Sequence, residues 1–150
     1  SWTVRSVGGT TLHWNGLAYR PQAHELRARD HYGAIAGASL ADWPVSLAGL
    51  EPALAEAERR LVVSGTGGRP VHGFSNQYRL LWNGARRIGY RRISNANIAI
   101  NVEESDGRPG CIAMGFCNQG CRISAKWSTL AAEVPRAERT GRLDLRSASH

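Results

Sequence analysis

Lysine is almost absent from this chain of 150 residues, since Lys126 is the single lysine among 19 basic residues. The basic residues outnumber the 12 acidic ones and give a net charge of +7. The arginines are scattered, with pairs such as Arg59–Arg60 and Arg86–Arg87 far apart, whereas a phosphate-binding face needs clustered bases with interleaved aromatic rings. The bias towards arginine, alanine and glycine is typical of genome composition, and the sequence predicts no nucleic-acid partner.

Long apolar runs are missing as well. No segment approaches the roughly 20 residues needed to cross a bilayer, so no membrane span is predicted. The hydrophobic share of 42% supports a packed core, and the length fits one domain or a piece of a larger one. The chain opens on Ser-Trp-Thr-Val-Arg without an initiating methionine and already resembles a strand there, which suggests that it was cut from a longer protein.

Cysteine is confined to one short window. Cys111, Cys117 and Cys121 follow a C-x5-C-x3-C spacing, and the rest of the chain has none. Their odd number argues against a closed disulfide framework. Three nearby thiolates with glycines between them could wrap an iron–sulfur cluster, whereas zinc would need a fourth ligand and no histidine is close in sequence. Three structural cysteines without any metal are the alternative.

The stretch VGGTTLHWNG at 7–16 combines adjacent glycines with hydroxyl and aromatic side chains. Gly8 and Gly9 permit positive φ and a close approach of another body. Thr10 and Thr11 offer hydroxyl and N–H groups to an anion or a ring edge. One interpretation is a turn followed by a half-buried strand, and the other is a loop wrapped round a cofactor. The local pattern leaves both open.

Caps and apolar spacing predict the helices. A short helix is expected from Pro21 through Arg29. Ser46 caps a short turn holding Leu47 and Leu50, and Pro52 is expected in the first turn of the next helix, which buries Leu54, Ala57 and Leu61. Ser75 caps a further helix that ends at Gly89, and residues 135–140 form the last one. Residues 2–7 and 10–14 are expected as strand or extended loop, and strands are expected over 98–100 and 142–146, with a turn over 105–110.

The cysteine window, continued through 122–129 and 134–146, resembles the glucose–methanol–choline (GMC) flavoprotein oxidoreductases, above all their bacterial sugar and polyol dehydrogenases. The opening VGGTT with its following His-Trp is similar to the flavin-contacting loop of that family. Asp42-Trp-Pro-Val-Ser46 matches the helix that follows the loop, and Asp106-Gly-Arg-Pro109 precedes the first cysteine as it does in the family. The resemblance extends from about residue 3 to 146.

The resemblance implies an α/β fold, or α+β mix, that is a partial FAD-binding Rossmann-like domain with part of the GMC substrate or cap region. The family's Gly-x-Gly-x-x-Gly fingerprint and catalytic histidine are absent, and no histidine lies between 73 and 149. Residues 1–150 are therefore interpreted as an internal fragment without a catalytic base. Its expected parts are a flavin-contacting loop (1–20), a helical or cap segment (21–110), a cysteine segment (111–129), and a helix and strand returning to the FAD domain (130–150).

The family's activity implies that FAD oxidises the CH–OH group of an alcohol, sugar or polyol by accepting a hydride at flavin N5. The residues expected to contact FAD are Gly8, Gly9, Thr10, Thr11, His13, Trp14 and Asn15. In pyranose-oxidase-like members the histidine at the position of His13 is bonded covalently to the flavin, and this attachment is a hypothesis here.

The cysteine spacing resembles that of dehydrogenases whose flavin subunit holds a 3Fe-4S cluster, which passes electrons to a cytochrome or another acceptor. Cys111, Cys117 and Cys121 would be its ligands. The rival hypothesis is a noncatalytic electron-transfer or metal-binding module built on these cysteines, and the third is a plain interaction domain. The sequence leaves open whether the bacterial parent is cytoplasmic or periplasmic.

Overall fold

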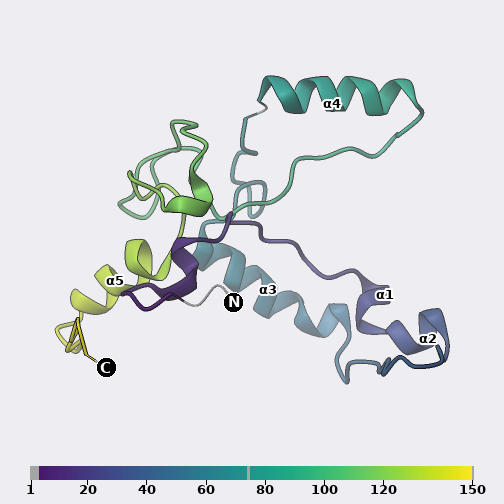
Figure 1. Cartoon of the computed structure of the whole chain (residues 1–150), viewed down its shortest axis with the longest axis horizontal. Coiled ribbons are helices and arrows are strands. Elements are labelled where there is room, and N and C mark those ends of the chain that lie inside the picture. Colours follow the sequence, from purple (N-terminus) through teal and green to yellow (C-terminus); the bar gives the residue numbers. More distant parts are fainter. Residues whose placement is uncertain (1–3, 74, 150) are drawn as a thin grey trace.

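The computed structural model describes residues 4–73 and 75–149. Its elements are η1 (Gly9–Leu12), α1 (Ala23–Leu26), α2 (Ala28–Tyr32), α3 (Leu47–Leu61), α4 (Asn76–Arg87), η2 (Cys117–Gln119), the π-helical turn η3 (Thr129–Glu133) and α5 (Val134–Glu138). The N-terminal loop with η1, the loops around η2, and η3 with α5 gather into one body, whereas α4 and the α1–α2 pair lie apart from it (Figure 1). The body brings the two ends of the described sequence together.

Three extended segments meet at the centre of this body. The segment 97–101 forms an antiparallel bridge with 16–18 through Leu17 and Ile98, and another with 125–127 through Ile100 and Lys126. Its partner changes within three residues, so the described residues form single bridges rather than a strand ladder. The strand expected over 98–100 is thus extended but isolated. The partial Rossmann-like domain stays a prediction, because helices and single bridges do not test it.

The buried residues are few, and nearly half of them are polar. The apolar ones are Leu26, Val62, Val63, Ala99, Ile100, Ala125 and Ala132, and the polar ones are Glu58, Ser64, Asn101, Arg108, Lys126 and Ser128. Buried polar groups are costly unless they are hydrogen-bonded, so the bonds made by the polar set decide how this part of the chain is held.

The expected helix caps are confirmed. The Ser46 hydroxyl accepts from the backbone N–H of Gly49 at 3.1 Å, and the Ser75 hydroxyl accepts from that of Tyr78 at 3.2 Å. Each satisfies one of the N–H groups that the first turn of a helix leaves without a partner. Gly89, with φ of +96°, follows the end of α4 in the left-handed conformation expected of a helix stop.

The division predicted at Pro52 is wrong, because α3 runs unbroken from Leu47 to Leu61 with Pro52 inside it. Pro52 removes one backbone hydrogen bond, but the rest of this 15-residue helix keeps its own. The buried face also differs from the prediction, since Ala57 is exposed and the carboxylate-bearing Glu58 is buried in its place. An ion pair with Glu58 explains the exchange.

The strand expected over 142–146 is absent, and the described residues of 2–7 and 10–14, expected as strand or extended loop, contain no strand. Residues 10–14 begin in η1, where the Thr11 hydroxyl bonds to the Gly8 carbonyl and competes with an extended backbone. Residues 142–146 have no regular structure, and their leucines, Leu143 and Leu145, are exposed because the described part of the chain offers no partner strand. Residues 4–7 form no strand either, and the beginning of the segment 2–7 lies outside the described residues.

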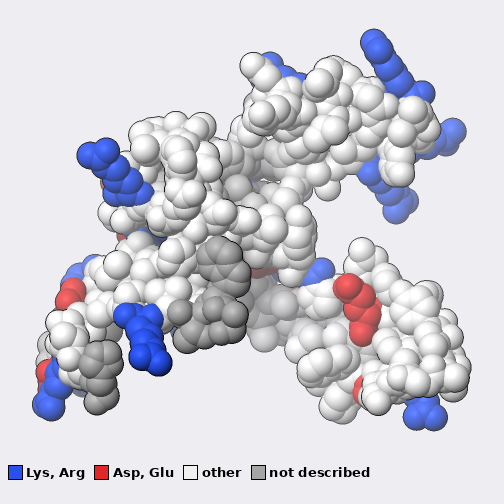
Figure 2. Space-filling model, viewed as in Figure 1, with Lys and Arg blue, Asp and Glu red and all other residues white. Residues whose placement is uncertain are grey.

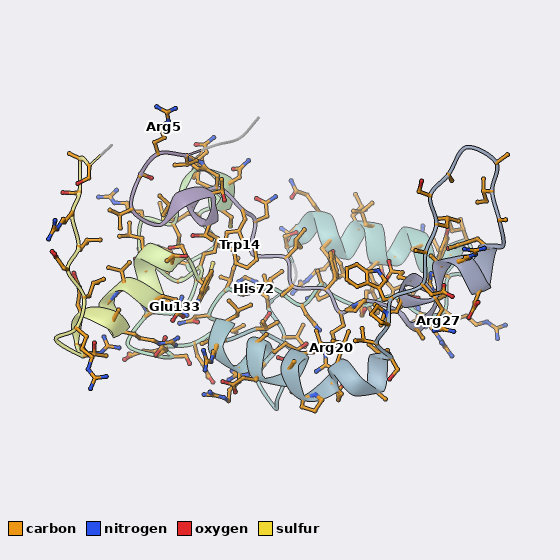
Figure 3. The ribbon with its side chains drawn as sticks, turned by 90° about the horizontal axis from the view of Figure 1, so that it is seen from below. Arg5, Trp14, Arg20, Arg27, His72 and Glu133 are labelled. Carbon is orange, nitrogen blue, oxygen red and sulfur yellow. The ribbon has the colours of Figure 1, made fainter. Side chains whose placement is uncertain are left out.

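Arg20 ties the loop before α1 to the side of α3 (Figure 3). Its Nε and Nη2 donate to both carboxylate oxygens of Glu58 at 2.6 and 2.8 Å, and its Nη1 donates to Glu51 at 2.6 Å. The hydrogen bonds from Arg20 hold the pKa of Glu58 below its ordinary value of 4.5. Because the Glu58 side chain is only 11% exposed, this pair is screened less than a surface pair.

We expect Glu58→Gln to destabilise the protein by about 1–2 kcal/mol at pH 7, between the values typical of exposed and buried pairs. The depressed pKa of Glu58 means that the unfolded state takes up the proton first. The stabilisation is therefore complete above pH 4.5 and is lost as the pH falls through the lower folded-state pKa. Unfolding followed from pH 7 to pH 3 checks this, and a variant with the wild-type acid dependence would contradict it. Glu104→Gln, at an exposed carboxylate for which the structure gives no ion pair among the described residues, is the control and should keep the wild-type acid dependence.

The described surface shows how the charge is spread. On the face seen in Figure 2, Lys and Arg side chains stand at several separate places, including the end of α4, and form no continuous patch. Within residues 4–73 and 75–149, no helix has both the length and the apolar character needed to cross a membrane.

Candidate functional site

The loop expected to contact flavin is a tight turn closed by its own threonine. The Thr11 hydroxyl donates to the Gly8 carbonyl at 2.5 Å and accepts from the backbone N–H of Thr129 at 3.0 Å. This second bond fixes η1 against η3, which lies 118 residues away in sequence. The Thr11 hydroxyl is therefore engaged in holding the loop, whereas Thr10 is exposed.

The two glycines have different roles. Both are left-handed, with φ of +95° at Gly8 and +55° at Gly9. A Cβ atom on Gly8 would lie 2.8 Å from the Cβ of Leu130, whereas one on Gly9 would meet nothing within 4 Å. The packing of Leu130 on the protein side thus requires Gly8 to be glycine. At Gly9 the backbone faces open space and can be approached by another body.

This difference predicts opposite outcomes for two alanine variants. Gly8→Ala should destabilise the protein by about 2–4 kcal/mol, because left-handed strain adds to a clash with Leu130. Gly9→Ala bears only the strain of about 1–2 kcal/mol, and its main effect should fall on the binding of FAD if this loop contacts the cofactor as the sequence predicts. Thermal unfolding of the flavin-free protein, together with FAD titration, separates the two effects. Equal destabilisation by both variants would contradict the packing role of Gly8.

Four of the residues expected to contact the cofactor share one open hollow. Thr10, Thr11, His13 and Trp14 line a space of about 290 Å³, and Asn15 is exposed and lies outside that lining. Trp14 lies directly after η1 (Figure 3), and its indole N–H donates to the Trp127 carbonyl at 2.9 Å. The rings of Trp14 and Trp127 meet edge to face at 5.9 Å. The hollow therefore has a fixed aromatic wall.

His13 reaches from this hollow to the cysteine segment. Its Nδ1 lies 3.0 Å from the carbonyl oxygen of Asn118, in η2. Because a carbonyl only accepts hydrogen bonds, Nδ1 carries the proton in this contact. The bond sets the orientation of the imidazole and is the first of several contacts between the two predicted motifs.

The three cysteines surround one cavity. Its volume is about 50 Å³, and it is lined by Cys111, Met114, Gly115, Phe116, Cys117, Gly120, Cys121, Arg122 and Ile123. Backbone N–H groups point at two of the sulfurs, from Ala113 to Cys111 Sγ at 3.3 Å and from Lys126 to Cys121 Sγ at 3.4 Å. Such N–H···S bonds stabilise a negatively charged sulfur.

The charges around Cys117 act in opposite directions. Burial raises the pKa of the Cys117 thiol above its ordinary value of 9.0, as do Cys111 and Cys121, while the positive charge of Lys126 lowers it. Burial in turn lowers the pKa of Lys126, and Cys117 and Cys121 raise it. These surroundings therefore favour the thiol form of Cys117, and a bound metal would favour its thiolate.

The described residues contain no group of three His, Cys, Asp or Glu side chains arranged to hold one metal ion. A single zinc ion would require such convergence. The three cysteines line one cavity, and a polynuclear cluster, in which each thiolate binds its own iron atom, asks for less convergence than a single ion. The assignment of Cys111, Cys117 and Cys121 as cluster ligands stays a prediction.

Lys126 joins the hollow to the cavity. Its side chain is 1% exposed, and its Nζ donates to the carbonyls of Leu12 at 2.9 Å, Trp14 at 2.6 Å and Cys117 at 2.6 Å. The η1 segment and the cysteine segment are thus bound to one ammonium group. In the sequence, Lys126 stands out only as the single lysine beside 18 arginines.

Arg108 and Asn101 are a second pair that the sequence reasoning missed. Arg108 donates to the carbonyls of Ser124 and Ala125 and to Asn101 Oδ1, and Asn101 Nδ2 donates back to the Arg108 carbonyl. The turn expected over 105–110 is confirmed, with reciprocal backbone bonds between Ser105 and Arg108 at 3.0 Å. The buried guanidinium of Arg108 holds this turn in place, and the turn leads directly into the segment that begins with Cys111.

The sequence of this chain has weak similarity to a known protein. No family model matches it. It is similar to the fructose dehydrogenase large subunit of Gluconobacter japonicus, with 26% identity over 156 residues that cover 92% of this chain and 27% of that relative. The chain therefore spans about a quarter of the relative's length. The similarity points to an oxidoreductase at the coarsest level.

Proposed function

We propose that this chain is part of an FAD-dependent oxidoreductase of the GMC type, acting on the CH–OH group of an alcohol, sugar or polyol. The observation that carries the proposal is the connection between two motifs about a hundred residues apart. His13 contacts Asn118, and Lys126 holds Leu12, Trp14 and Cys117 together. A loop that contacts flavin and a loop that holds an electron relay must lie close together, because electrons pass directly from one cofactor to the other.

The residues around the hollow fit the edge of a flavin. Gly9 leaves its backbone open to a close approach, and Thr10 presents an exposed hydroxyl. Trp14 supplies a flat apolar wall, and the carbonyl of Asn118 fixes the ring of His13. When bound there, FAD would supply the hydride acceptor at N5. Gly8 and Thr11 shape the loop from the protein side, through Leu130 and Thr129.

The residues around the cavity fit a small iron–sulfur cluster, which would supply a one-electron store. Cys111, Cys117 and Cys121 would hold it, and the N–H groups of Ala113 and Lys126 would stabilise the sulfurs of the outer two cysteines. The apolar side chains of Met114, Phe116 and Ile123 form part of the lining of the cavity. A cytochrome or similar acceptor would take the electrons further.

The substrate belongs to the full-length protein, because we assign no catalytic base to this chain. The name of the distant relative makes D-fructose the first sugar to try, followed by other sugars and polyols. The rival function, a noncatalytic electron-transfer or metal-binding module, is favoured only by the cysteine cavity. It gives no account of the hollow lined by Thr10, His13 and Trp14.

The visible absorption spectrum of the full-length protein, recorded before and after acid precipitation, tests the proposal. Flavin bands bleached by one of the sugars, above a broad iron–sulfur shoulder, would support it. Yellow colour in the acid pellet that His13→Ala moves to the supernatant would establish covalent attachment through His13. A colourless protein that takes up no added FAD would refute the flavoenzyme, and a shoulder without flavin would favour the rival module.

A further inference from the structure

The single lysine of the chain is buried among carbonyls rather than placed at the surface. Its Nζ has three acceptors within 2.9 Å, and they come from both the η1 segment and the cysteine segment. The backbone N–H of Lys126 also donates to the sulfur of Cys121 at 3.4 Å. Lys126 thus bonds to Trp14, which lines the hollow, and to Cys117 and Cys121, which line the cavity.

We infer that Lys126 is a positioning residue that fixes the flavin loop against the cysteine loop and raises the reduction potential of the cluster held there. This inference deepens the proposed function and rests on it, because the potential requires a cluster. The anchoring of the two loops is independent of any cofactor.

The hydrogen-bond geometry requires Lys126 to be charged. An ammonium has three N–H donors, and the Nζ of Lys126 meets three carbonyl acceptors. A neutral amine has only two donors and would turn its lone pair to one of these carbonyls, leaving two negative dipoles in contact. The carbonyls thus stabilise the cation at a position that is 1% exposed.

A buried positive charge acts on redox chemistry more strongly than an exposed one. The acidic groups that act on Lys126 are Cys117 and Cys121, two of the expected ligands. A cluster gains one negative charge on reduction, so a nearby cation stabilises its reduced form and raises its potential. Arg122 lines the same cavity but is exposed, so water and salt screen its charge.

Two substitutions separate charge from anchoring. Lys126→Gln removes the charge but keeps two N–H donors, whereas Lys126→Met removes both. Arg122→Met is the matched control, because it deletes a positive charge at the same cavity from the solvent side. The full-length protein is used for all variants, with a redox titration of the cluster followed by electron paramagnetic resonance.

We expect both Lys126 variants to shift the ratio of oxidised to reduced cluster about tenfold towards the oxidised form at a fixed potential, which is a fall of about 59 mV. Arg122→Met should shift that ratio less than about threefold. A Lys126→Gln cluster that titrates at the wild-type potential would overturn the electrostatic part of the inference. The Gln variant decides this even where the Met variant does not fold.

Hydrogen exchange of the metal-free and flavin-free protein tests the anchoring by itself. Amides in 9–16 and 117–121 should exchange about tenfold faster in Lys126→Met than in the wild type, with a smaller effect in Lys126→Gln. Unchanged exchange in both variants would overturn the anchoring. A wild-type protein that binds no iron would refute the proposed cluster instead, and the exchange result would still decide whether Lys126 holds the loops.

Discussion

Cys117→Ser in the full-length protein should abolish cluster binding while leaving the FAD content unchanged. Cys117 lies between the other two cysteines in sequence, its thiol lines their cavity, and its carbonyl is bound by Lys126. A serine hydroxyl is not a thiolate ligand, so the loss should exceed the roughly 10- to 100-fold effect of removing an outer-shell partner. Iron per protein and the rate of acceptor reduction should both fall to background, while substrate still bleaches the flavin.

Met114→Leu is the matched control for this variant. Met114 lines the same cavity and also carries sulfur, but it is not among the expected ligands. Its replacement should leave the iron content as in the wild type. Retention of iron in Cys117→Ser would remove Cys117 from the ligand set, and loss of flavin together with iron would mean that the variant disrupts the whole body.

Arg108→Met should lower the free energy of unfolding by about 3 kcal/mol, the largest stability effect expected from a single charged residue here. Arg108 is 4% exposed, and its guanidinium donates to Ser124, Ala125 and Asn101. Methionine fills much of the same space but removes the donor to the Ser124 carbonyl and to Asn101 Oδ1, whereas the Ala125 carbonyl keeps its bond from the backbone N–H of Asn101. Removing the buried charge also removes the cost of its desolvation. The expected loss in the free energy of unfolding is therefore smaller than the summed energies of the lost hydrogen bonds.

Thermal or urea unfolding of the full-length protein measures this effect. Arg142→Met, in an exposed segment, should stay within about 0.5 kcal/mol of the wild type. Combining Arg108→Met with Asn101→Ala should cost less than the two changes added, since each side chain bonds the other residue. Strict additivity, or no destabilisation by Arg108→Met, would contradict the anchoring of the turn.

Local chemistry made part of this structure predictable. A hydroxyl at Ser46 or Ser75 caps a helix through atoms three residues away, and Asp106-Gly107 makes a turn through its own backbone preferences. The grouping of the cysteines round one cavity followed in the same way, because they lie within eleven residues of one another in sequence. In each case the partners are neighbours along the chain.

The features that sequence reasoning missed depend on distant partners. Gly8 stays an expected contact of the cofactor, but its sequence neighbours gave no sign that a side chain there would meet Leu130. The alternation over 142–146 predicted a strand, but the described residues offer it no partner. Glu58 took the buried place expected for Ala57 because Arg20 reaches it. Periodicity carries no information about which residue approaches from elsewhere.

Lys126 shows the same limit at the candidate site. Nothing in its neighbourhood in sequence predicts that it bonds to Leu12 and Trp14, more than a hundred residues earlier. The sequence supplied two motifs, and the structure supplied their connection. The function proposed for the chain depends on that connection, because a hydride acceptor and a one-electron relay must lie close together to work in series.

The most direct test of this account follows electrons from flavin to cluster in the full-length protein. An anaerobic sample would be mixed with D-fructose, or with whichever sugar bleaches the flavin, and frozen for electron paramagnetic resonance. The account predicts that the signal of the oxidised three-iron cluster disappears once the flavin is bleached. A flavin that bleaches while the cluster signal persists in full would contradict it, because the two motifs would then not form one electron-transfer unit.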